Sequence, residues 1–147
     1  MKIVIGVDDS KNSQRAIQYV KQMKWPDGTN VIVVSAVREL VPVYSEVYAA
    51  ASLYSEQLME DLLRAHQEIA AAAAKELAGV GFVTESQVHL GDPRAVVVDV
   101  ARSEHADLVV VGSHGHTGIA KVLLGSVASH IVSHAPCSVL VVKVQTS

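Results

Sequence analysis

The amino-acid sequence predicts an α/β fold, with one domain over residues 1–147 built on a doubly wound, five-stranded parallel sheet of strand order 3-2-1-4-5. Half of the residues are hydrophobic but only 4% are aromatic, so Val, Ala, Leu and Ile must form the core. This composition suits buried parallel strands with alanine-rich helices on both faces, a three-layer sandwich. Apolar runs also alternate with helical stretches too long for hairpins, which predicts right-handed βαβ units.

The first strand is expected over residues 2–7, and Asp8-Asp9-Ser10 follows it as a sequence that can start a helix. That helix ends at the turn-forming residues 25–28. Its expected inner face carries Ala16, Ile17, Val20 and Met23. The second strand is expected over residues 31–37.

Residues 39–52 lack a clear period and contain Pro42, so we expect a long connection at the carboxyl end of the second strand. Loop packing or a subunit contact is the preferred explanation for Tyr44 and Tyr48. Covering a bound ligand is the alternative.

A long helix is expected over residues 53–77, ended by Gly79 and Gly81. Its expected buried stripe consists of Leu58, Leu62, Ala65, Ile69, Ala73 and Leu77. Residues 84–90 alternate less cleanly and predict an edge strand.

The last third of the chain supplies two more helices and two more strands. Asp92 and Pro93 are expected at the N-cap and the first position of a helix. Its expected inward-facing residues are Val97, Val100 and Ala101. A buried strand over residues 108–111, a short helix over 126–134 and a strand over 139–142 complete the fold.

Glycines gather after the fourth strand. Two residues separate Gly112 from Gly115, nine residues separate Gly115 from Gly125, and Ser126 follows Gly125 directly. Glycine lets backbone approach a ligand closely or adopt a positive φ. A small hydroxyl residue can cap a helix whose N–H groups attract an anion. The stretch therefore predicts a phosphate site, and the alternative is that the glycines form turns only.

The predicted strand order places a second group beside these glycines. The order reverses between strands one and four, and ligands of open α/β sheets bind at that point, beyond the carboxyl ends of the strands. Asp8 follows strand one and Gly112 follows strand four. Both are therefore expected in one crevice.

Several functional classes find no support in the sequence. The chain has neither the Walker motif nor a dinucleotide-binding G-x-G-x-x-G after its first strand. Aromatic residues on which a flavin would stack are scarce. The net charge is −3 and no dense basic patch occurs, so nucleic acid is not an expected partner.

The sequence also predicts a soluble, cytoplasmic protein. Its one cysteine, Cys137, cannot form an internal disulfide, which fits a reducing compartment. No apolar run approaches the roughly 18–20 residues of a membrane span. The N-terminus reaches Asp8 without the apolar region of a signal peptide.

The whole chain resembles the single-domain universal stress proteins. The resemblance lies in Gly112-x-x-Gly115, nine residues, then Gly125-Ser126, the family's nucleotide motif G-2x-G-9x-G-(S/T). Residues 7–10 and residues 135–142 also match the family. The resemblance implies binding of ATP, or of ADP or AMP, with Mg²⁺ on the phosphates. The identity of the base, adenine, is implied by the resemblance alone.

Carried over by position, the motif implies a role for each residue. Val7 and Asp8 would flank the adenine and ribose, and backbone groups of Ala36 would meet the adenine edge. Gly112 and Gly115 would pass under the ribose and phosphates. The phosphates would be held by Gly125, Ser126 and Val127.

Five further residues call for a specific expectation. His114 lies inside the motif, where contact with a phosphate or a metal and a solvated loop position both remain open. His116 stands where the family often has Arg or Lys, which weakens phosphate affinity and makes it pH-dependent. His130 and His134 have a metal-like spacing but are interpreted as a surface pair. Cys137 has no identifiable base and is not expected to be a nucleophile.

Two features bear on assembly. The family's last strand commonly pairs with its twin, so we expect a homodimer through residues 139–142. Ser138 replaces the family's usual proline and leaves that strand intact.

The leading functional hypothesis is a dimeric stress-response protein that senses or sequesters ATP. One alternative is a slow ATPase or nucleotidyl transferase that uses Asp8 or a histidine, although no Walker lysine and no catalytic dyad occur in the sequence. The other is a client-binding scaffold in which the nucleotide is structural.

Overall fold

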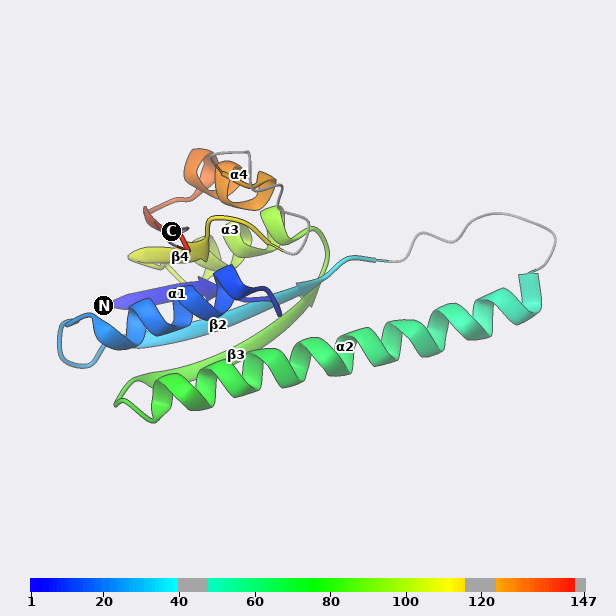
Figure 1. Ribbon diagram of the computed structural model, residues 1–147. Helices are drawn as coiled ribbons and strands as arrows, with labels where there is room; N and C mark the ends of the chain where they lie inside the picture. Colours follow the sequence, from blue (N-terminus) through cyan, green and yellow to red (C-terminus); the bar gives the residue numbers. More distant parts are fainter. Residues whose placement is uncertain (40–47, 116–123, 145–147) are drawn as a thin grey trace.

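The computed structural model describes residues 1–39, 48–115 and 124–144, with backbone alone for residues 48–54. Strands and helices alternate along the chain (Figure 1). They are β1 (Lys2–Gly6), α1 (Lys11–Gln22), β2 (Asn30–Val37), α2 (Tyr48–Ala78), β3 (Val83–Leu90), α3 (Pro93–Ser103), β4 (Leu108–Gly112), α4 (Ser126–His134) and β5 (Ser138–Val142).

The strands form a parallel sheet of order β3-β2-β1-β4-β5, which confirms the predicted topology. Helices α1 and α2 cover one face, and α3 and α4 cover the other (Figure 1). β3 lies at one edge, as predicted, and β5 lies at the other. The strand order reverses between β1 and β4, so the carboxyl ends of these two strands mark the expected ligand position.

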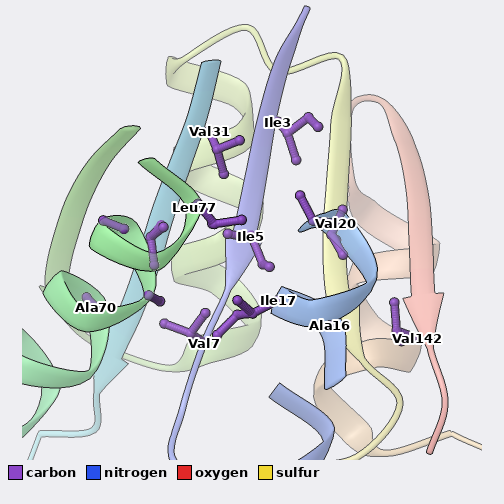
Figure 2. Packing of buried hydrophobic residues seen from close by; sticks show 14 of the residues in the cluster. Ile3, Ile5, Val7, Ala16, Ile17, Val20, Val31, Ala70, Leu77 and Val142 are labelled. Carbon is purple, nitrogen blue, oxygen red and sulfur yellow. The ribbon is translucent and has the colours of Figure 1, made fainter. Parts of the chain in front are cut away.

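Two apolar layers hold the sheet between its helices. In β1, Ile3 and Ile5 point toward α1 and α2, whereas Val4 points toward α3 and α4, as the two-residue period of a strand requires. All three are fully buried. Figure 2 shows the first layer, in which Ile17 and Leu77 from the two helices pack against β1. Each fully buried side chain of this kind contributes about 1.5–3 kcal/mol.

The predicted start of the third helix is confirmed. Asp92 is the N-cap of α3, and its side chain accepts a hydrogen bond from the N–H of Arg94 at 2.9 Å. Pro93 occupies the first helical position. Val97, Val100 and Ala101 are buried, as expected.

The boundaries of α2 correct the prediction. The helix begins at Tyr48 rather than at residue 53, so the end of the expected connection is helical. The alanine-rich sequence after Tyr48 favours helix and contains no residue that would stop it. Leu58 is 49% exposed, contrary to the expected stripe, because the first turns extend beyond the sheet (Figure 1). Ala65 is also exposed, although the next residue, His66, contacts Ser35 of β2. The buried residues of α2 are Ala70, Ala73, Ala74 and Leu77.

The expected positions of Met23 and Tyr44 are not confirmed. Met23 does not face the core: it is the C-cap of α1 and is 46% exposed. Tyr44 lies outside the described residues. None of the helices in the described ranges combines the length and the apolar character that crossing a bilayer requires.

Candidate functional site

Hydrogen bonds to β2 hold the backbone just beyond the end of β1. The N–H of Val7 donates to the carbonyl oxygen of Val34 at 2.8 Å. The hydroxyl of buried Ser35 donates to the carbonyl oxygen of Val7 at 3.0 Å. His66 on α2 lies with its Nδ1 2.7 Å from the same hydroxyl oxygen. Both backbone polar groups of Val7 are therefore held by β2.

Asp8 is held by the start of α1. Its N–H donates to Ser13 Oγ at 3.0 Å, and its Oδ1 accepts the N–H of Ser10 at 2.9 Å. Ser10 is the N-cap of α1 and accepts the N–H of Ser13 at 3.1 Å. The helix is thus capped by Ser10, while the Asp8 carboxylate braces the turn before it. The second oxygen of that carboxylate, Oδ2, lies toward Gly115.

Ser113 joins the two halves of the glycine motif. Its N–H donates to the carbonyl oxygen of Val142 at 2.9 Å, and its carbonyl oxygen accepts the N–H of Gly125 at 2.7 Å. Its hydroxyl donates to Asn12 Oδ1 at 3.2 Å and lies 3.1 Å from His114 Nδ1. A hydroxyl has one proton, so His114 must donate from Nδ1 in this arrangement. The motif is therefore tied to β5, α1 and α4 at one residue that is 3% exposed.

Close approach, rather than a left-handed turn, explains the motif glycines. The described glycines with positive φ are Gly28, Gly81 and Gly91, so none belongs to the motif. A Cβ on Gly115 would lie 3.1 Å from Asp8 Oδ2. A Cβ on Gly125 would lie 3.1 Å from the carbonyl oxygen of Ser113. The motif glycines therefore keep the backbone close to neighbouring groups without a positive φ, and their role at a phosphate stays a prediction.

Gly112 is required by packing between β4 and α1. A Cβ there would lie 2.7 Å from Asn12 Cβ and 2.8 Å from its carbonyl carbon, distances that force the helix to shift. Substitution of Gly112 by Ala is expected to lower the free energy of unfolding by about 1–3 kcal/mol through overpacking. Urea unfolding followed by circular dichroism measures this loss. Gly115→Ala is the control, with a smaller expected loss, and equal unfolding midpoints for both variants and the unchanged protein would contradict this account.

The turn after β1 and the glycine motif border a cavity of about 200 Å³ at the carboxyl ends of β1, β2 and β4. Seven of the nine predicted site residues line it, namely Val7, Asp8, Ala36, Gly112, His114, Gly115 and Val127. Gly125 and Ser126 do not line it but lie beside it at the start of α4. The structure therefore brings Asp8 and the glycine motif together across the switch point.

The start of α4 differs from the sequence expectation. Gly125, not Ser126, is the N-cap, and no side chain makes a capping hydrogen bond there. Ser126 is the exposed first residue of the helix. The first N–H groups of a helix lack partners within the helix and carry its positive dipole end. An anion beside Gly125 would meet these groups.

The sequence prediction missed several wall residues of the cavity. Arg38, Pro93 and Val97 line it with Val34 and Val111. Arg38 follows β2 directly, so the rule that selected Asp8 after β1 would have found it. Pro93 and Val97 belong to the helix that follows the edge strand, and their nearness to the switch point depends on how that crossover packs.

Arg38 is partly tethered at the cavity rim. Its guanidinium lies 3.5 Å from Asp92, which also binds the guanidinium of Arg94 at 2.6 Å. Hydrogen bonds from the Arg94 side chain and N–H, with the nearby charge of Arg38, hold the pKa of the Asp92 carboxyl far below its ordinary value. Asp92 is therefore an anion that keeps a positive charge at the β2 side of the cavity. The side chain of Arg38 remains 61% exposed.

Two further expectations concern reactive groups. Burial, with a smaller contribution from Asp107, raises the pKa of the Cys137 thiol. The thiolate is the nucleophilic form of cysteine, and burial disfavours it here. His116 lies outside the described residues. Within the described ranges, no group of three or more His, Cys, Asp or Glu side chains could hold a metal ion.

The model of the universal stress protein family matches residues 1–143 of the chain. The chain belongs to the universal stress protein family. Universal stress protein Sll1388 of Synechocystis is 28% identical over 97% of either chain. Universal stress protein MJ0577 of Methanocaldococcus jannaschii is 29% identical, with 99% of this chain and 96% of that protein covered.

Solved structures of universal stress proteins share the fold. The MJ0577 structure has a TM-score of 0.86 at 28% identity and covers 99% of this chain and 97% of its own. A crystal structure of a universal stress protein in complex with cAMP has a TM-score of 0.69 at 28% identity, with 100% and 98% covered. The family resemblance and the doubly wound topology are therefore confirmed.

Proposed function

We propose that this universal stress protein binds an adenine nucleotide, ATP with Mg²⁺ in particular, in the cavity between β1 and β4. The observation that carries the proposal is the meeting of Asp8, Gly115 and the start of α4 around one cavity at the switch point. A similar universal stress protein has been crystallised with cAMP, which supports an adenine nucleotide as the ligand.

The apolar wall of the cavity suits a flat base. Val7, Ala36 and Val97 present aliphatic groups, and Pro93 adds a rigid ring on the α3 side. Ala36 is the penultimate residue of β2. At this end of the strand its backbone polar groups can meet the edge of the base. A few polar groups in an apolar cavity fix the orientation of a small molecule. We assign the base to this wall.

Asp8 suits the ribose. Its Oδ1 is engaged by Ser10, which fixes the carboxylate plane, and its Oδ2 lies on the Gly115 side of the cavity. Ribose hydroxyls are donors, and an ionised carboxylate is an acceptor with room for more than one hydrogen bond. Gly115 keeps the space beside Oδ2 clear of a side chain.

The start of α4 suits the phosphates. Gly125 presents no side chain there, and the N–H groups of Ser126 and Val127 belong to the first turn. Uncapped N–H groups at a helix N-terminus bind anions with the help of the helix dipole. His114 lies on the same side of the cavity and adds a donor when protonated. Mg²⁺ would be bound mainly by phosphate oxygens and water, as it often is in nucleotide complexes.

Replacement of Asp8 by Asn tests this assignment. The amide keeps an oxygen for the N–H of Ser10 but replaces the charged acceptor that faces the ribose. Hydrogen bonds to charged groups contribute about 1.5–3 kcal/mol, so the dissociation constant for ATP is expected to rise roughly tenfold or more. Isothermal titration with ATP and with 2′,3′-dideoxy-ATP measures the effect, and the variant should bind both compounds almost equally.

Asp9→Asn is the matched control, because this neighbour removes the same charge next to the cavity. It does not line the cavity among the described residues. If both variants weaken ATP equally, the effect is one of net charge and the ribose assignment is wrong. Unchanged discrimination against the dideoxy compound in Asp8→Asn would also contradict it.

We also propose that the protein works as a homodimer through β5 and that nucleotide occupancy is what it senses. β5 is a short strand at the edge of the sheet and pairs with β4 along one side only among the described strands. An open strand edge is a template for pairing with a second chain. Its action in the cytoplasm stays a prediction.

A further inference from the structure

Two histidines on α4 lie face to face, away from the nucleotide cavity. His130 is half-buried and His134 is exposed, and neither lines the cavity. Their ring centroids are 4.0 Å apart, with an angle of 13° between the ring planes. Residues four apart on a helix share one face, so the backbone holds the pair together.

A hydrogen bond fixes the proton of one ring. His134 Nδ1 lies 2.9 Å from the carbonyl oxygen of His130. A carbonyl oxygen only accepts, so Nδ1 carries the proton and the neutral ring has its lone pair on Nε2. Metal-binding histidines almost always donate their second ring N–H to a carbonyl, a carboxylate or water in this way. The ring is therefore already in the form that binds a metal.

The spacing and position of the pair also suit a cation. Zinc–imidazole bonds are about 2.0–2.1 Å long, so two nitrogens on one ion lie at most about 4.2 Å apart. The ring centroids are separated by 4.0 Å in a parallel stack, so both rings must rotate out of the stack, until their planes meet at the ion, for one nitrogen of each to bind it. His134 is the last residue of α4, where the negative end of the helix dipole favours a positive charge.

We propose that His130 and His134 form a two-histidine site for a late first-row divalent metal ion, Cu²⁺, Ni²⁺ or Zn²⁺. Imidazole suits these three ions, and Cu²⁺ is expected to bind most tightly. No group of three or more ligating side chains occurs in the described ranges, so water completes the coordination. The site is independent of the nucleotide and of the proposed function.

Titration of metal-free, untagged protein with NiCl₂ and with CuSO₄ tests the site. Chelation needs both rings, so His130→Gln and His134→Gln are each expected to lose at least tenfold in affinity, almost as much as the double variant loses. His89→Gln is the control, since His89 is an exposed histidine on β3 and should keep full affinity.

Electron paramagnetic resonance of the Cu²⁺ complex gives a second readout. Two imidazole nitrogens are expected on the ion in the unchanged protein and one in either single variant. Unchanged circular dichroism shows that the variants fold. Two outcomes would show that the histidines are only a stacked surface pair. One is a loss of metal affinity in the single variants no greater than that in His89→Gln, and the other is a single imidazole nitrogen on Cu²⁺ in the unchanged protein.

Discussion

Replacement of Gly125 by Val is expected to raise the dissociation constant for ATP by roughly a hundredfold or more, because the hydrogen bonds that we propose between the phosphates and the start of α4, about 1.5–3 kcal/mol each, would depend on this position. The first side-chain atom would already lie 3.1 Å from the carbonyl oxygen of Ser113 and 3.3 Å from His114 Cα. A β-branched residue would therefore push the start of α4 away from the motif. It would also cover the N–H groups that we assign to the phosphates. Isothermal titration with ATP and with adenosine measures the loss.

Adenosine separates a phosphate effect from a general collapse of the cavity. It lacks phosphates, so its affinity should fall much less than that of ATP in the Gly125 variant. Ser129→Val is the matched control, because it places the same side chain on an exposed position of the same helix. Full ATP affinity in Gly125→Val would remove the phosphate site from the start of α4.

Replacement of Val141 by Asp is expected to convert the proposed dimer to a monomer. Val141 is half-buried on the edge strand β5, and strand pairing across an axis would bring two such carboxylates into the interface. Burying an unpaired charge costs several kcal/mol, which exceeds what a short strand-pairing interface can absorb. Sedimentation velocity at micromolar protein measures the change.

Two variants make the assembly test specific. Val83→Asp adds the same charge to β3 at the opposite edge, where Val83 is 65% exposed, and should leave the dimer intact. Val141 also packs against the core beneath α3 and α4, so its variant can lose stability. Ser138→Lys avoids this, because Ser138 is exposed at the start of β5. If the folded Ser138→Lys and Val141→Asp proteins both sediment as dimers, the interface lies elsewhere.

Much of the fold follows from local sequence signals. Short β-branched runs, the Asp92-Pro93 helix start and the scarcity of aromatic residues define the strands and helices, and the sheet has the predicted order. Once that order is assumed, parallel strands bring Asp8 and Gly112 to one edge. Residues more than a hundred positions apart could therefore be assigned to one site without coordinates.

What could not be predicted depends on packing between elements. The role of Gly112 against Asn12 arises where α1 crosses β4, and no local signal encodes that crossing. The hydrogen bonds of Ser113 join three elements in the same way. The predicted start of α2 at residue 53 was wrong. Residues 39–52 lack a clear helical period and were therefore interpreted as a loop, although the alanine-rich sequence after Tyr48 favours helix. The predicted burial of Leu58 was wrong for a related reason. The helix continues there beyond the sheet, where no other element covers the Leu58 side chain.

The central claim is that the cavity between β1 and β4 holds an adenine nucleotide. Equilibrium dialysis of nucleotide-free protein against radiolabelled ATP and Mg²⁺ at physiological concentrations tests it most directly. We expect saturation at one ATP per chain, with unlabelled AMP and adenosine as competitors and GTP as a much weaker one. No saturable binding of ATP, ADP or AMP at millimolar concentration would contradict the claim.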